Sequence, residues 1–229
     1  ERPKGITEQK VIHIYTSATP NGWKATVTLE ELEIPYKVHA IDLSEGEQHT
    51  EEFLKLNPNG RIPVLHDDET ETTVFESGAL MLYLAKKYEK LVPKEERDYW
   101  QCLQWLMFQM GGIGPMQGQA VVFERYFAKD VPEAKMRYKN ETRRLYEVLD
   151  KRLSTVDFLA GDYSIADIAN WCWVKTHRWA RVSVEGLENL QRWIEVIAER
   201  PQVARGIAVP PPAGTASKQV RMGSAITSK

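Results

Sequence analysis

Apolar and polar positions in the first 75 residues alternate in short runs instead of long helical stretches. Short apolar and aromatic runs cover residues 11–15 and 35–41, and two more begin at residues 63 and 72. Runs of this length, bounded by turn-forming residues, predict four strands. Helices are predicted between and after these strands, over residues 23–33, 51–56 and 76–90.

The predicted order of elements is β-α-β-α-β-β-α, which is the order of a thioredoxin-like α/β domain. A parallel pairing with a right-handed crossover is expected for the first two strands. The polar turn at residues 67–68 allows the last two strands to pair antiparallel.

From residue 92 onward the pattern is helical. Residues 95–110, 132–153 and 187–200 have helical spacing, and the glycines and the proline in residues 111–115 should break or kink the first of these helices. We therefore expect a thioredoxin-like domain at residues 1–91 and an all-helical C-terminal domain at residues 92–209. Residues 210–229, rich in Pro, Ala and Ser, predict a flexible tail.

One helix start is predicted in detail. Ser164 can cap a helix and Asp167, three residues later, can complete a capping box. Losing either side chain should cost about 1 kcal/mol of stability. We expect this motif to serve folding and to have no catalytic role.

The composition of the chain argues against several classes of function. The chain has 30 basic and 32 acidic residues and a formal net charge of −2, which gives no electrostatic case for nucleic acid or an anionic membrane. Its apolar runs are shorter than the ~20 residues of a membrane span, and residues 1–4 lack a signal peptide's apolar core. A cytoplasmic protein is expected, although a targeting segment before residue 1 stays an open alternative.

The metal-ligating residue types are sparse. Five scattered histidines lack metal-ligand spacing, and Cys102 and Cys172 are too few for a disulfide framework. Both cysteines lie among apolar residues and are expected to be buried, inert thiols. No metal site is predicted.

The candidate chemistry begins where a polar turn enters an apolar run at Ile62 and Pro63. If the bond between them is cis, the backbone groups of Ile62 are open to a peptide-like ligand. Glu76 and Ser77 follow a second apolar run and open a helix. Ser77 and the free N–H groups there can hold a carboxylate, and Glu76 can hold an ammonium group. Together these groups match the γ-glutamyl-cysteinyl part of glutathione.

The motif of residues 61–64 followed by Glu76 and Ser77 resembles the glutathione-binding core of the cytosolic glutathione transferases. Residues 19–24 and 114–119 narrow the resemblance to the bacterial Nu-class transferases and their fungal relatives, which resemble the yeast nitrogen-regulation prion protein. The resemblance covers about residues 10–209. It implies glutathione as cosubstrate, a homodimer and a role in detoxification.

The resemblance also implies residue roles around the sulfur. Asn21 is the residue beside the thiol, Thr19 is a hydroxyl donor, and Ser17 is the main rival, since serine serves other transferase classes. The alternative for Asn21 is that it only forms a turn with Gly22. No cysteine lies near this segment, so a mechanism through a protein thiol is excluded.

Further contacts are implied or inferred around the tripeptide and the second substrate. By resemblance, Gln48 contacts the glycine end of glutathione, although its charge-rich segment is equally typical of an exposed surface. Arg61 either assists there or faces solvent. Apolar side chains near the helix kink are expected to line a second-substrate site or simply to belong to the core: Met110, Ile113 and Met116.

Two activities fit this site: transfer of the glutathione thiolate to an electrophile, and reduction of small disulfides by glutathione. A hypothesis of another class is a glutathione-binding regulatory or scaffold protein with vestigial catalysis, as in the yeast prion relative. The chain has no Asn- and Gln-rich extension like that of a prion-forming protein, which disfavours prion-like assembly.

Overall fold

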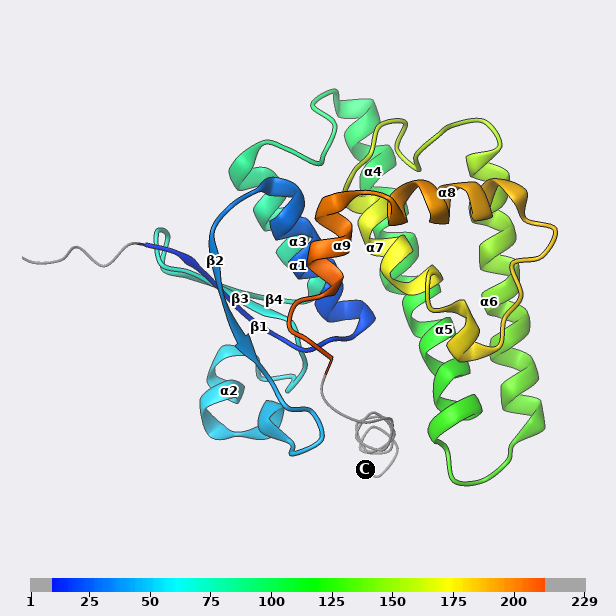
Figure 1. The fold of residues 1–229 in the computed structure, drawn as a ribbon, viewed down its shortest axis with the longest axis horizontal. Helices are drawn as coiled ribbons and strands as arrows, with labels where there is room; N and C mark the ends of the chain where they lie inside the picture. Colours follow the sequence, from blue (N-terminus) through cyan, green and yellow to red (C-terminus); the bar gives the residue numbers. More distant parts are fainter. Residues whose placement is uncertain (1–9, 213–229) are drawn as a thin grey trace, which may run out of the picture.

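The computed structural model describes residues 10–212. A four-stranded mixed sheet stands beside a set of helices (Figure 1). The strands lie in the order β2-β1-β3-β4, with bounds Ile12–Thr16 for β1, Tyr36–Ala40 for β2, Val64–Asp67 for β3 and Thr72–Phe75 for β4. β1 pairs parallel with β2, and β3 pairs antiparallel with both β1 and β4. The predicted thioredoxin-like arrangement is confirmed.

The alternation along β1 explains the packing of the sheet. Ile12 and Ile14 are buried, whereas His13 and Tyr15, on the opposite face, are only half-buried. The apolar face packs on α1 (Pro20–Leu32) and α3 (Ser77–Tyr88), which contribute Leu29, Leu80 and further side chains to one apolar cluster. The short helix α2 (Glu51–Leu56) follows a 3-10 turn, Glu47–His49.

The remaining elements are helices. They are α4 (Glu96–Phe108), α5 (Gly114–Val121), α6 (Pro132–Leu153), α7 (Ile165–Val174), α8 (Glu188–Ala198) and α9 (Pro201–Ile207). A π-helical turn at Val122–Tyr126 follows α5, and a 3-10 turn lies at His177–Ala180. A larger apolar cluster joins these helices and reaches Val27 and Met81 of the α/β part. The domain boundaries near residues 91 and 209 stay predictions.

Residues 111–115 change the geometry of the helix without ending it. The chain passes from α4 into α5 through a π-helical turn, Gln109–Ile113. A π-helical turn adds a residue to the helical ring and redirects the side chains beyond it. Pro115 follows this turn after Gly114, and because it has no N–H it cannot donate to the preceding helical turn.

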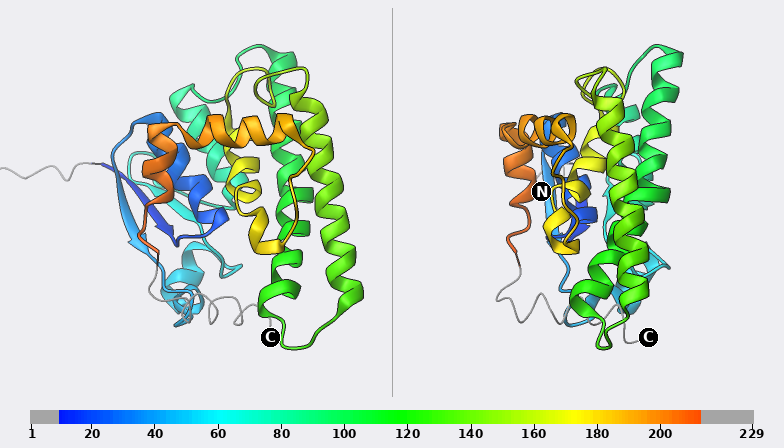
Figure 2. Two further views of the ribbon diagram at one scale, coloured as in Figure 1. Left: turned by 45° about the vertical axis from the view of Figure 1, so that its right-hand side comes forward. Right: turned by 90° about the vertical axis from the view of Figure 1, so that its right-hand side faces the viewer.

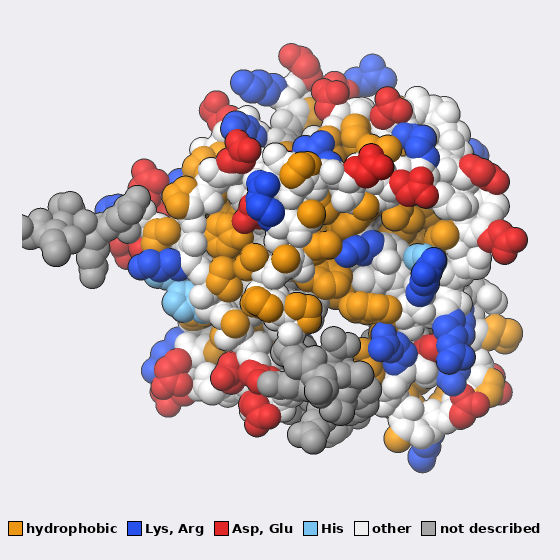
Figure 3. All heavy atoms as spheres, in the orientation of Figure 1, with side chains coloured by type: hydrophobic (Ala, Val, Ile, Leu, Met, Phe, Trp, Pro, Cys, Tyr) orange, Lys and Arg blue, Asp and Glu red, His pale blue; other side chains and the backbone are white. Residues whose placement is uncertain are grey.

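The last helix returns to the first. α9 lies beside α1 (Figures 1 and 2). A Cβ on Gly206 would lie only 2.5 Å from the Cα of Val27. The hydroxyl of Thr26 donates to the carbonyl of Gly206 at 2.7 Å. Hydrophobic side chains gather over α9, α1 and α7 on the face drawn in Figure 3. These contacts fix the position of α1.

The capping box at the start of α7 is confirmed. Ser164 accepts from the Ala166 N–H, and Asp167 accepts from the Ser164 N–H at 3.1 Å. Asp167 also accepts from the Leu159 N–H and from Trp193 Nε1, each at 2.9 Å. Its complete burial raises its pKa to about 6, against the effect of these donors. Asp167 thus joins three segments in addition to capping one helix.

The sequence predicted neither a membrane-spanning segment nor a metal site. Within residues 10–212 no helix is long and apolar enough to cross a membrane, and no group of three or more His, Cys, Asp or Glu side chains is arranged for a metal ion. Cys102 and Cys172 are buried, and burial raises the pKa of both thiols. Most of the predicted tail, from residue 213 onward, lies outside the described residues.

Candidate functional site

Strand register brings three predicted segments to one edge of the sheet. Tyr15 pairs with Val64, and Val64 pairs with Phe75. Since β1 and β4 both run antiparallel to β3, the end of β1, the start of β3 and the end of β4 share that edge. Residues 16–21, 61–63 and 76–77 extend directly from these strand ends. The candidate site lies where the three segments meet.

The Ile62–Pro63 peptide bond is cis. Pairing of β3 begins at Val64, so the backbone of Ile62 lies outside the strand ladder. The turn before it is held by Asn57, whose Nδ2 donates to the Arg61 carbonyl at 2.6 Å. Asn57 is buried and also accepts from the Asn59 N–H at 2.9 Å. The sequence pattern gave no sign of this bracing role.

Glu76 and Ser77 open α3 as expected. Glu76 has φ of 70° and ψ of 116°, in the left-handed half of the map that favours glycine. Such a conformation costs about 1–3 kcal/mol and persists only where the surrounding structure imposes it. The Glu76 side chain is exposed, whereas Ser77 is only 4% exposed. An exposed carboxylate and a recessed hydroxyl therefore stand side by side at a helix N-terminus.

A lysine lies behind Ser77. Lys24 of α1 is 1% exposed, and its Nζ lies 3.3 Å from Ser77 Oγ. The same ammonium donates to Gln109 Oε1 and lies 3.7 Å from Met110 Sδ. Burial lowers the pKa of Lys24 to about 7, although the nearby Cys172 and Glu76 act in the opposite direction. The sequence analysis missed Lys24; the available signal was a lysine inside the apolar stretch of α1.

The segment before α1 forms a tight turn. Thr19 is the N-cap, and its hydroxyl oxygen accepts from the Gly22 N–H at 3.2 Å. A Cβ on Gly22 would lie 2.0 Å from the Ser17 carbonyl oxygen, so only glycine fits this turn. Ser17 itself is buried, while Asn21 is half-buried.

A hydrogen bond from the helical part of the molecule fixes the side chain of Asn21. Its Oδ1 accepts from Trp173 Nε1 of α7 at 3.0 Å. Gln117 of α5 donates to the Trp173 carbonyl at 2.7 Å, and a Cβ on Gly118 would lie 3.2 Å from the indole ring. The two sequence motifs at residues 19–24 and 114–119 therefore meet through Trp173, another residue that sequence reasoning missed.

Gln48 differs from its expected environment. We expected an exposed segment, but Gln48 is only 5% exposed, and its 3-10 turn lies against Gly60. A Cβ on Gly60 would lie 3.2 Å from the Gln48 carbonyl oxygen. Its Oε1 is buried and has no hydrogen-bond partner among residues 10–212. Arg61, by contrast, is exposed.

The three candidate residues for the second-substrate site differ in burial. Ile113 is fully buried within the larger apolar cluster. Met110 is half-buried, with its Sδ 4.0 Å from Ser77 Oγ, and Met116 is half-buried against the core. Only Met110 and Met116 thus retain accessible surface.

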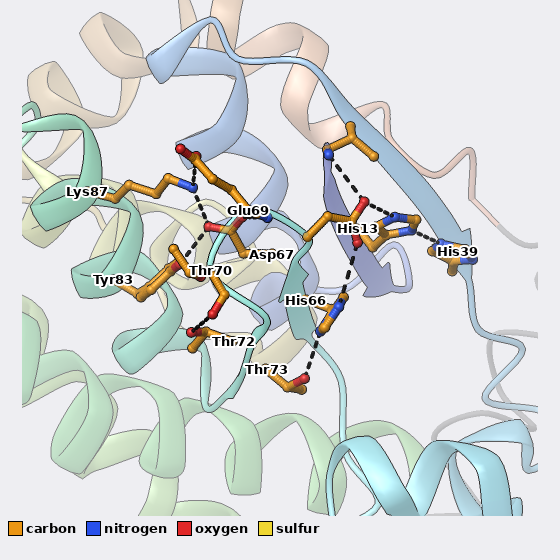
Figure 4. Close-up of polar contacts among 12 residues, drawn as sticks. His13, His39, His66, Asp67, Glu69, Thr70, Thr72, Thr73, Tyr83 and Lys87 are labelled. Atoms are coloured by element: carbon orange, nitrogen blue, oxygen red, sulfur yellow. Dashed lines mark hydrogen bonds and ion pairs between the residues drawn. The ribbon is translucent and has the colours of Figure 1, made fainter. Parts of the chain in front are cut away.

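A second polar cluster lies on the sheet (Figure 4). His13 Nδ1 lies 2.9 Å from His39 Nε2, and His13 Nε2 lies 3.1 Å from Asp68 Oδ2. His66 Nδ1 contacts the Thr73 hydroxyl at 2.9 Å. The period-2 alternation of the strands places these histidines on one face. They form a hydrogen-bonded cluster separate from the candidate site.

Comparisons with known proteins agree with this architecture. Residues 10–86 match the glutathione S-transferase N-terminal domain, and residues 116–201 match the C-terminal domain. The disulfide-bond oxidoreductase YfcG of Escherichia coli is 40% identical over 203 residues, which cover 86% of this chain and 94% of that protein.

Solved structures show the same relationship. A Pseudomonas putida glutathione transferase, with one glutathione disulfide bound per subunit, superimposes with a TM-score of 0.85 at 37% identity, covering 89% of this chain and 94% of that one. The transferase URE2P6 of Phanerochaete chrysosporium, in complex with oxidized glutathione, gives 0.82 at 38% identity, covering 88% and 96%. With its bacterial and fungal relatives, this chain belongs to the glutathione S-transferase family, as its motifs predicted.

Proposed function

We propose that this protein is a glutathione-dependent enzyme that transfers the glutathione thiolate to electrophiles and reduces small disulfides. The observation that carries the proposal is the meeting of Ile62, Glu76 and Ser77 with the Asn21 turn at one sheet edge. Relatives named as disulfide-bond oxidoreductases, and a relative that binds glutathione disulfide, support both activities.

Each end of the tripeptide has a matching group. Ser77 and the N-terminus of α3 bind the γ-glutamyl α-carboxylate, and Glu76 binds the neighbouring ammonium group. The backbone of Ile62 pairs with the cysteinyl residue, with Pro63 fixing the turn. Gln48 and Arg61 bind the glycine end of the tripeptide. The Gln48 Oε1 atom has no hydrogen-bond partner within residues 10–212, which supports its role as an acceptor for an N–H group of the ligand.

Thiolate formation uses hydrogen bonds instead of a protein base. Asn21 donates an amide N–H to the sulfur but does not titrate, so it stabilises the anion and the proton leaves to solvent. The positive end of α1 acts in the same direction, and the Thr19 O–H is the second donor. Ser17 is less exposed than Asn21, which supports Asn21 as the principal donor.

The two reactions share this thiolate. In conjugation it attacks an electrophilic carbon next to Met110 and Met116. A carbon–sulfur bond forms and the bond to the leaving group breaks, so that chlorodinitrobenzene releases chloride. In reduction it attacks one sulfur of a disulfide and releases the other as a thiolate; a second glutathione then resolves the mixed disulfide to glutathione disulfide. No protein cysteine takes part, consistent with the burial of Cys102 and Cys172.

Two assays test the proposal. We expect turnover with glutathione and chlorodinitrobenzene, with hydroxyethyl disulfide, or with both, and their ratio gives the dominant activity. Saturable binding of glutathione by calorimetry without turnover in either assay would instead support a regulatory binding protein.

We further propose a cytoplasmic homodimer with a detoxifying role. Trp100 and Met107 are 50% and 46% exposed and lie seven residues apart, on one face of α4. Phe75 is 39% exposed on the edge strand β4. Sedimentation equilibrium should give a dimer that Trp100→Glu dissociates, whereas Met136→Glu, on exposed α6 surface, should not; a wild-type monomer would contradict the proposal.

A further inference from the structure

Lys24 is a buried cation without an acidic partner. Its Nζ contacts Ser77 Oγ at 3.3 Å, the Gln109 side-chain oxygen, and Met110 Sδ at 3.7 Å, all of them neutral groups. Of the ion pairs within residues 10–212, none includes Lys24. A buried ammonium group is costly unless a counter-ion compensates it.

The charged and titratable groups around Lys24 do not supply that counter-ion. From α3, Glu76 acts at a distance, and its side chain is exposed. From α7, the Cys172 thiol is neutral at physiological pH, because burial raises its pKa to about 12. Lys175 acts on Cys172 and would add charge of the same sign. The π-helical turn offers only the neutral Gln109 and Met110.

The contact with Ser77 has a direction. An ammonium group can only donate, so Ser77 Oγ must accept from a protonated Lys24. The Ser77 O–H is then available to donate outward from the N-terminus of α3. A neutral Lys24 can accept instead, which would turn the hydroxyl hydrogen inward. Protonation of Lys24 therefore fixes Ser77 as a donor toward a ligand.

We propose that Lys24 is the buried counter-ion of the glutathione α-carboxylate bound at Ser77, and that glutathione binding is coupled to proton uptake by Lys24. The inference rests on the proposed function, because it assigns that carboxylate to Ser77. Lys24 acts on the ligand through Ser77 and is a positioning residue. It selects for an anion at this subsite.

Proton linkage gives the test. In the free protein burial lowers the pKa of Lys24 to about 7, so that the group is partly deprotonated near neutral pH. A bound carboxylate favours the charged form and raises that pKa. Binding should then take up a fraction of a proton near pH 7 and a larger fraction near pH 8. Affinity should fall as the pH rises above 7.

The probe is S-methylglutathione, because its sulfur cannot titrate. Calorimetric titrations at pH 6, 7 and 8, each in two buffers with different heats of ionisation, give the number of protons taken up. We expect uptake to grow from pH 6 to pH 8 in the wild type. The analogue that lacks only the γ-glutamyl α-carboxylate should bind without that uptake.

Two lysine variants locate the proton. Lys24→Met should abolish the uptake, flatten the pH dependence of the dissociation constant, and weaken S-methylglutathione binding at pH 6 about tenfold or more. Lys175→Met is the matched control, since burial also lowers the pKa of Lys175 but the side chain lies over Trp23 and Trp171 instead of Ser77. It should keep the wild-type proton uptake.

The outcomes are separable. Saturable binding of S-methylglutathione without proton uptake, or uptake that persists in Lys24→Met, overturns the inference and leaves the proposed function standing. Absence of any binding by the wild type overturns both. If Lys24→Met does not fold, the wild-type comparison of the ligands with and without the carboxylate decides the question.

Discussion

The indole N–H of Trp173 donates to Oδ1 of Asn21 at 3.0 Å, across 152 positions of sequence. Since the indole nitrogen can only donate, the carbonyl end of the Asn21 amide must face it. The Nδ2 hydrogens therefore lie at the opposite end of the amide. Trp173 fixes which end of Asn21 can be offered to a thiolate.

Removing this N–H should impair sulfur activation more than binding. Trp173→Phe keeps an aromatic ring but removes the donor, so the Asn21 amide can rotate. Losing one hydrogen bond costs about 1 kcal/mol, which corresponds to a rise of up to about one unit in the pKa of bound glutathione thiol. Thiolate absorbance followed against pH would measure that rise.

A matched indole is available as control. Trp171 lies in the same helix and donates to the Ile194 carbonyl at 2.9 Å, away from Asn21. Trp171→Phe should reduce stability without moving the thiol titration. Equal titration shifts in both variants would contradict a specific role for Trp173.

The choice between Asn21 and Ser17 can be decided by the same titration. Asn21→Ala should bind glutathione nearly normally, because Ile62, Glu76 and Ser77 remain. Its bound thiol pKa should rise, so turnover should fall at neutral pH and recover at higher pH. Ser17→Ala should leave the titration in place; a shift in Ser17→Ala alone would make this a serine-type transferase.

Glu76 and Ser77 should dominate affinity. Removing one partner of a charge-assisted hydrogen bond costs roughly 1.5–3 kcal/mol, or about ten- to a hundredfold in the dissociation constant. Glu76→Ala and Ser77→Ala should each show a loss of this size in calorimetry. Glu89→Ala is the control, since Glu89 also has a positive φ, 50°, but lies at the other end of α3. Wild-type affinity in Glu76→Ala would place the site elsewhere.

Much of the fold follows from local patterns. The apolar and aromatic run at residues 11–15 predicted β1, and the spacing of Ser164 and Asp167 predicted the capping box. Such signals are local because a strand face or a helix cap is decided within a few residues. The parallel pairing of β1 with β2 and the antiparallel pairing of β3 with β4 were also expected from the order of elements.

The site was only partly predictable, because its supports come from distant segments. Lys24 lies 53 positions from Ser77 and 85 from Gln109, so its burial depends on tertiary packing. The charged neighbours of Gln48 favoured a surface residue almost as much as a ligand contact, but the residue is buried. Trp173 had no local signal at all. Motifs give the groups that contact a ligand more readily than the groups that orient them.

Replacing Asp167 should cost more stability than the loss of a helix cap alone. The sequence predicted a loss of about 1 kcal/mol, but its carboxylate also accepts from the Leu159 N–H and from Trp193 Nε1. Asp167→Ala leaves these buried donors unsatisfied, at about 1–3 kcal/mol each, so we expect a loss above 3 kcal/mol. Ser164→Ala should lose only about 1 kcal/mol. Urea unfolding of both variants would measure the difference. Equal losses would mean that Asp167 stabilises the fold only as a helix cap.

The titration of Lys24 should change how the stability of the ligand-free protein depends on pH. Burial lowers its pKa from the ordinary 10.5 to about 7. Between these values the unfolded chain binds more protons than the folded one, so this group makes stability rise with pH. Below pH 7 the full cost of burying the charge remains, on the order of a few kcal/mol.

Lys24→Met removes this titration. Relative to wild type, the variant should be most favourable near pH 6.5 and lose that advantage steadily toward pH 10. The Gln109 oxygen loses its donor at every pH, which costs about 1–3 kcal/mol and shifts the level of the difference without changing its slope. The slope is therefore the measurement: urea unfolding of both proteins at several pH values, without glutathione. Parallel stability curves would mean that Lys24 keeps an ordinary pKa in the folded protein.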